Sequence, residues 1–145
     1  MAAAGLTKKS IDHGAWASEI LDRGADIYGN WSFGCAAASD LLRKRGLNLA
    51  CHPRFMKSLE ECGPYLRDER PMILSLRFER GELPLSPLGR TSGHLVLLHS
   101  IADSEALVHD PAAKNSREVP RRYEARALDR AWKNSGRLAY VFESK

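Results

Sequence analysis

The chain has 145 residues, of which 43% are hydrophobic, and this is enough for one domain with a buried core. The formal net charge is +4 and the sequence pI is about 9.1, but charges of both signs are present and no aromatic stacking pattern accompanies the basic clusters. These features disfavour a dedicated nucleic-acid binder. The start of the chain reads as neither a signal peptide nor a membrane span, because its apolar run is only a few residues long. We therefore expect no nucleic-acid partner and no membrane partner.

The predicted elements place helices first and antiparallel strands afterwards. In chain order they are helices over 11–23 and 33–45, a short strand over 47–51, an interrupted helix over 55–66, a strong strand over 71–78, a long loop over 79–92, a hairpin over 94–110, a helix over 123–134 and a last strand over 137–142. Ser32 is expected to cap the second helix and Gly46 to close it, and Gly63-Pro64 to interrupt the third. This order is typical of an α+β fold. No repeat or linker interrupts it, so we predict a single domain over 1–145.

The three cysteines, Cys35, Cys51 and Cys62, form no C-x-x-C motif and pair with no histidine at zinc spacing. An odd number of cysteines argues against a full disulfide framework and is typical of a reducing compartment. The sequence as written therefore predicts a cytoplasmic protein that holds no metal ion.

The hairpin "GHLVLLHSIADSEALVHDP" (93–111) carries a histidine and an aspartate at its open end. If its turn has three residues, Asp110 falls opposite Val96 and on the same face as His94, within reach of the imidazole. A two- or four-residue turn would separate them to opposite faces. A carboxylate beside a histidine fixes its tautomer and supports the imidazolium, as in Cys-His-Asp systems. For an arbitrary pair, however, a histidine bonded at a strand end and an aspartate capping a turn are commoner.

Five segments occur in an order that resembles a known family: "YGNW" (28–31), "PMILSLRFERGELPLSP" (71–87), "SGHLVLLHSI" (92–101), "VHDPAA" (108–113) and "Y…LDRAWKNSGRLAYVF" (123–142). Together they resemble the bacteriocin-processing-peptidase-like, or double-glycine-peptidase-like, group of papain-fold cysteine peptidases. The resemblance implies a papain-like α+β fold and a bacterial thiol protease that acts on peptides or proteins without a cofactor. It also implies that His94 is the general base and that Asp110 is its orienting partner.

The sequence departs from this family at two functional positions. The family's nucleophilic Cys lies at the head of the first helix, in a Cys-Ser-Pro-Thr-Ser-like stretch that follows an oxyanion-hole Gln. Here no residue matches that Cys, and the sequence contains no glutamine. "MAAAGL" resembles the back half of that helix, so we expect an N-terminally incomplete domain, inactive as written. A true N-terminus upstream would make a secreted or periplasmic protein conceivable.

Cys35 is the best substitute nucleophile within the chain, since it lies in the first turn of a predicted helix and precedes His94 and Asp110. Its alanine neighbours favour a structural, buried cysteine instead. Asn30 and Trp31 are weaker candidates for substrate binding, and Trp31 packing on the second helix is the simpler interpretation. The alternative function is a non-catalytic peptide-binding module, a pseudo-peptidase.

Overall fold

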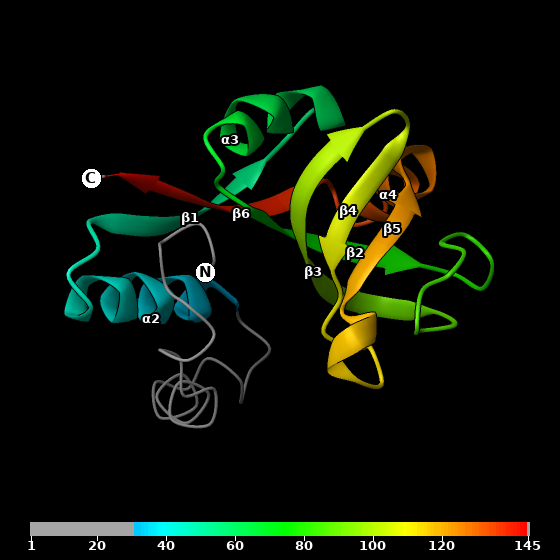
Figure 1. Cartoon of the computed structure of the whole chain (residues 1–145), viewed down its shortest axis with the longest axis horizontal. Helices are drawn as coiled ribbons and strands as arrows, with labels where there is room; N and C mark the ends of the chain where they lie inside the picture. The colour runs from blue at the N-terminus through cyan, green and yellow to red at the C-terminus, as the bar shows by residue number, and fades with distance from the viewer. Residues whose placement is uncertain (1–30, 145) are drawn as a thin grey trace. The chain divides into compact units, whose positions relative to one another are not determined.

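The computed structural model describes residues 31–144, which group into two compact units (Figure 1). Within the described residues, one unit comprises 31–53 and 140–144, and the other comprises Arg54–Ala139. The helix expected over 11–23 lies outside the described residues. The single-domain organisation stays a prediction.

The first unit contains helix α2 (Trp31–Lys44), most of strand β1 (Leu49–Phe55) and most of strand β6 (Leu138–Ser144), which lies beside β1. Helix α2 begins earlier than expected, so Ser32 is inside the helix and the prediction that it caps it is wrong. The helix ends as predicted before Gly46, whose φ of +77° is the left-handed conformation that glycine adopts without strain.

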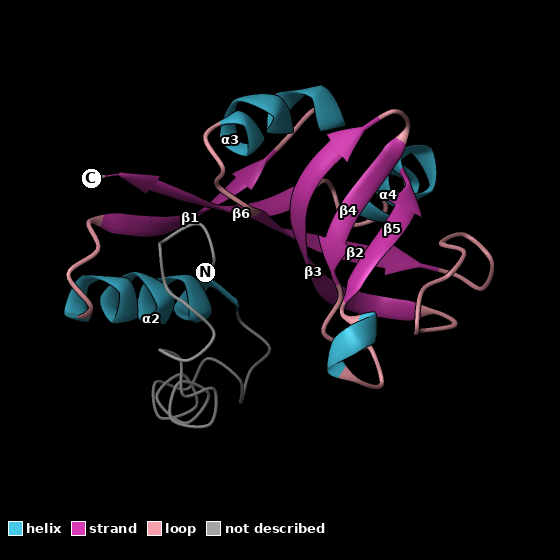
Figure 2. Cartoon of the chain, viewed as in Figure 1, coloured by secondary structure: helices cyan, strands magenta, loops and turns pink. Residues whose placement is uncertain are grey.

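The second unit is built on four antiparallel strands in the order β2-β3-β4-β5 (Figure 2). They are β2 (Met72–Phe78), β3 (Thr91–Ala102), β4 (Glu105–His109) and β5 (Pro120–Glu124). Strand β5 was not predicted from the sequence, because it is short and mostly charged.

The helices of the second unit differ from the prediction at their starts. A 3₁₀ turn, η3 (Leu59–Cys62), leads into α3 (Gly63–Arg67), so Gly63-Pro64 begins a helix rather than interrupting one. Proline is tolerated there because the first helical N–H groups have no intrahelical partner. Helix α4 (Ala125–Lys133) begins after β5, where the Glu124 carboxylate accepts a hydrogen bond from Ala127 N at 3.1 Å.

The core of the second unit lies between one face of β2 to β5 and helix α4. Alternate β2 residues are fully buried, and Ala127, Leu128, Ala131 and Trp132 of α4 are buried as well. The Trp132 indole donates a hydrogen bond to the Leu138 carbonyl at 2.8 Å, which satisfies its only polar atom.

Candidate active site

His94 and Asp110 meet in the second unit at the open end of the β3–β4 hairpin. His94 is on β3, and Asp110 directly follows β4. The His94 Nε2 and Asp110 Oδ1 atoms are 2.8 Å apart, and the side chains are 11% and 0% exposed. The structure therefore brings together the two residues that sequence reasoning singled out, and it leaves the imidazole in contact with solvent.

His94 and Asp110 lie on one face of the sheet although the turn between β3 and β4 has two residues. Ala102 pairs with Glu105 around a two-residue turn, Asp103–Ser104, which is one of the turn lengths that the sequence left open. Both turn residues have positive φ, +50° and +67°, as in the tight turns that match the twist of a hairpin. On its own, a two-residue turn would place His94 and Asp110 on opposite faces.

A β-bulge at His99 restores the shared face. The β3–β4 register shifts between Leu98 and Ser100, which makes His99 an extra residue on β3. Beyond the bulge Leu97 pairs with His109, and the same register extended by one residue puts Asp110 opposite Val96. Because alternate residues share a face, His94 and Asp110 then point to the same side of the sheet.

Asp110 is the one buried charged residue of the described core, and donors surround it. Its Oδ1 accepts a hydrogen bond from Ala112 N at 2.9 Å in addition to the His94 contact, and its Oδ2 accepts one from the Tyr123 hydroxyl at 2.7 Å. Burial opposes ionisation, but the hydrogen bonds from His94, Tyr123 and Ala112 outweigh it and lower the pKa of Asp110. The site therefore holds a carboxylate in a fixed orientation.

Tyr123 is a site residue that sequence reasoning missed. It lies on β5, opposite Ala106 of β4, and is 1% exposed. Burial, followed by the hydrogen bond to Asp110 and the negative charge of that carboxylate, raises the pKa of Tyr123, so the hydroxyl stays protonated as a donor. The alternation of Arg121 and Tyr123 in "PRRYE" was the available signal for a strand, but Tyr123 was expected to begin a helix and no element was predicted for the residues directly before it.

The loop over 79–90 is attached to the strand that carries Tyr123. The Arg121 guanidinium donates a hydrogen bond from Nη1 to the Leu85 carbonyl oxygen at 2.7 Å. Leu85 has a φ of +67° and its side chain is largely exposed. A bulky residue in this conformation is strained, and such strain often marks a functional segment.

Cys35 lies in the first unit and contacts a second cysteine. It is the fifth residue of α2, so its expected place in the first helical turn is wrong. Its Sγ is 3.3 Å from Cys51 Sγ, and both residues are buried. The Cys51 thiol donates this hydrogen bond, which outweighs burial and lowers the pKa of Cys35. Asn30 lies outside the described residues, and the Trp31 side chain is likewise not described.

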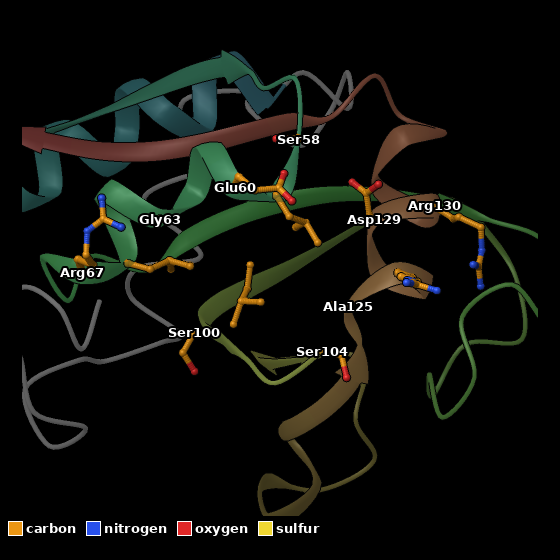
Figure 3. A pocket seen from close by; sticks show the side chains of 13 residues that line it. Ser58, Glu60, Gly63, Arg67, Ser100, Ser104, Ala125, Asp129 and Arg130 are labelled. Atoms are coloured by element: carbon orange, nitrogen blue, oxygen red, sulfur yellow. The ribbon is translucent and has the colours of Figure 1, made fainter.

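A separate cavity of about 780 Å³ lies in the second unit at the turn end of the hairpin (Figure 3). Ser100 and Ser104 from the hairpin, Glu60 from η3 and Asp129 from α4 are among the residues that line it. Neither His94 nor Asp110 lines this cavity, so it is distinct from the candidate active site.

Two further properties concern the described part of the chain. Between residues 31 and 144, no three His, Cys, Asp or Glu side chains are gathered as they would be around a metal ion. No helix in the same range is long and apolar enough to cross a membrane.

Comparison with known proteins supports the resemblance. Residues 1–140 match the model of the peptidase C39-like family. A crystal structure from Bacillus anthracis, named as that of a C39-like peptidase, aligns with a TM-score of 0.54 and 17% identity over 77% of this chain. The chain spans only 58% of that solved chain. No curated protein matches the sequence. The family match and the structural likeness confirm the expected α+β, papain-like fold.

Proposed function

Because the chain belongs to the peptidase C39-like family, we propose that His94 and Asp110 form the base half of a Cys-His-Asp system that hydrolyses peptide bonds. The observation that carries this proposal is the 2.8 Å contact between His94 Nε2 and Asp110 Oδ1. The full burial of Asp110 and its two further hydrogen bonds support it. The substrate class is a peptide or protein.

The proposed chemistry assigns a role to each nitrogen of the His94 ring. With Nε2–H donating to Asp110, Nδ1 is the nitrogen that takes a proton from a cysteine thiol. The thiolate attacks the carbonyl carbon, the imidazolium protonates the leaving amine, and water then hydrolyses the acyl-enzyme. Asp110 fixes the tautomer and stabilises the imidazolium. The scheme requires no metal ion or organic cofactor.

Tyr123 is a positioning residue in this proposal. Its hydroxyl donates to Asp110 Oδ2, the oxygen that does not contact His94, and so restrains rotation of the carboxylate. Together with the Ala112 N–H it keeps Asp110 aimed at the imidazole. Loss of this restraint should affect the rate through the orientation of His94.

The nucleophile of the proposed scheme has no matched residue in this sequence. The family's Cys and Gln lack counterparts here, and Cys35 is engaged with Cys51. We therefore expect the 145-residue chain alone to bind peptides without cleaving them. In the alternative, a pseudo-peptidase, peptide binding is the whole function.

The test compares the 145-residue chain with the protein obtained by reading the codons upstream of Met1 in frame. Both are incubated with a mixed peptide pool, and new termini are counted by mass spectrometry. We expect no cleavage by the shorter chain, cleavage by the longer one, and a loss of about 10²–10⁴-fold in rate on His94→Ala. The matched control is His52→Ala, which removes an exposed histidine of β1.

Three outcomes would change the assignment. Full activity of the longer protein after His94→Ala would overturn the role of His94. Cleavage by the shorter chain that is abolished by Cys35→Ser would make Cys35 the nucleophile. A stop codon directly upstream, with peptide binding and no cleavage, would favour the pseudo-peptidase.

A further inference from the structure

Two thiols of the first unit lie against each other in a buried setting. Cys35 on α2 and Cys51 on β1 are each 7% exposed, and their sulfur atoms are 3.3 Å apart. Ser39 fixes the backbone on both sides of the pair: its hydroxyl accepts a hydrogen bond from Cys51 N at 2.9 Å and donates one to the Cys35 carbonyl at 2.8 Å. The Ser39 hydroxyl therefore joins the backbone of α2 at Cys35 to the backbone of β1 at Cys51 and keeps the two cysteines side by side.

The two thiols are chemically unequal. The Cys51 S–H donates to Cys35 Sγ, which lowers the pKa of Cys35. The same hydrogen bond, followed by burial, raises the pKa of Cys51. The contact places the Cys51 sulfur within 3.3 Å of the Cys35 sulfur, where it can resolve an oxidised Cys35.

We propose that Cys35 and Cys51 form a reversible intramolecular disulfide when the protein meets a hydroperoxide, and that this bond cross-links α2 to β1. The site is separate from His94 and Asp110 in residues and in chemistry. The proposed disulfide is therefore independent of the proposed peptidase function.

The chemistry balances in two steps. The Cys35 thiol loses its proton, and its sulfur attacks the peroxide oxygen; the O–O bond breaks, leaving a sulfenic acid on Cys35 and, for hydrogen peroxide, water. The Cys51 sulfur then attacks the Cys35 sulfur, the S–O bond breaks, and a second water leaves with the Cys51 proton. In total, two thiols and one hydrogen peroxide give one disulfide and two waters. An added thiol or phosphine reductant reverses the reaction.

Cys62, the third cysteine, provides an internal control. It ends η3 and is fully buried in the second unit. Burial, with the negative charges of Glu61 and Asp129, raises the pKa of Cys62 to about 12. It should therefore stay a thiol under conditions that oxidise the other two.

The experiment uses the reduced 145-residue chain treated with hydrogen peroxide and then unfolded in the presence of an alkylating agent. Untreated protein should carry three alkyl groups and oxidised protein one, on Cys62. Tryptic digestion without reduction should release residues 24–43 linked to residues 46–54, the peptides that contain Cys35 and Cys51. Reduction before alkylation should restore three alkyl groups.

Variants test the order of the two steps. Cys51→Ser should stop at a sulfenic acid on Cys35, which dimedone traps, whereas Cys35→Ser should slow oxidation of Cys51 by at least about tenfold. Cys62→Ser should still form the bond. Three alkylatable cysteines after peroxide treatment, a link that includes Cys62, or a link between two molecules would overturn the proposal. Peptide mapping of the unsubstituted chain is by itself enough to support or overturn the proposal. The test therefore does not depend on whether every variant folds.

Discussion

His94 and Asp110 share one face of the sheet because β3 carries one residue more than β4 between the turn and the site. His99 is that residue, and the register shift at this point reverses the parity set by the two-residue turn. The 2.8 Å contact between His94 Nε2 and Asp110 Oδ1 therefore depends on a backbone irregularity five residues from the histidine.

The ionised state of Asp110 should make the protein acid-sensitive. Its folded pKa lies below the unfolded value, so its stabilising contribution is present above the unfolded pKa of about 3.9 and is lost as pH falls through the folded pKa. Asp110→Asn should lower the free energy of unfolding at pH 7 by about 1–3 kcal/mol and flatten its decrease below pH 4. Urea unfolding at pH 7 and pH 3.5 measures both effects. The exposed control Asp103→Asn should change neither, and an unaltered acid slope in Asp110→Asn would refute the prediction.

Removing the Tyr123 hydroxyl should weaken the network without opening the core. Tyr123→Phe keeps the buried ring but deletes the 2.7 Å hydrogen bond to Asp110 Oδ2. We expect a loss of about 1–2 kcal/mol in unfolding free energy and a higher pKa for Asp110, visible as an acid transition that begins at higher pH. Tyr65→Phe on α3, which removes a hydroxyl outside this network, is the control. Equal acid transitions in the two variants would argue against a positioning role.

His99, the bulge residue, should make the free energy of unfolding depend on pH in a second range. Burial, and then the charge of His109, lower the pKa of His99 from 6.5 to about 4, and its Nε2 is buried without a hydrogen-bond partner among the described residues. The unfolded chain therefore binds more protons between these values, and stability should fall as pH decreases from 6.5 to 4. Full protonation of His99 in the folded protein would lower the free energy of unfolding by at most about 3 kcal/mol. The actual loss should be smaller, because the ring is partly exposed and solvent screens its charge. Unfolding of His99→Gln measured from pH 4 to pH 7 should lose this slope, whereas that of His52→Gln should keep it.

A glycine in the β3–β4 turn should raise the free energy of unfolding. Ser104 has a φ of +67°, which costs a residue with a Cβ more than glycine. Ser104→Gly preserves the backbone carbonyl that accepts from Ala125 N at 2.7 Å, and it should raise the unfolding free energy by up to about 1 kcal/mol. Ser100→Gly, in β3, should lower it. Thermal unfolding of the two variants gives the comparison, and destabilisation by Ser104→Gly would contradict this account of the turn.

The sequence identified strand β2 because its signal is local, whereas the roles of His94 and Asp110 came from the family resemblance and their shared face depended on a turn length that the sequence left open. The segment 71–78 is mostly apolar, with Ser75 and Arg77 as exceptions, and indicates a strand, in which alternate side chains are fully buried. Strand β5 was missed because "PRRYE" has few apolar residues and owes its place to hydrogen bonds with β4. Tyr123 was missed with it. The bulge was equally hidden, because a polar residue within a strand does not by itself indicate a bulge and only the pairing with β4 reveals the extra residue.

The three hydrogen bonds on Asp110 also have an entropic consequence. A carboxylate held through both oxygens by Tyr123, Ala112 and His94 has lost its rotational freedom when the chain folds. The imidazole, in turn, needs no further ordering when a peptide arrives. Binding at this end of the hairpin should therefore show a small unfavourable entropy for the site itself, because its side chains are already ordered before any ligand is present.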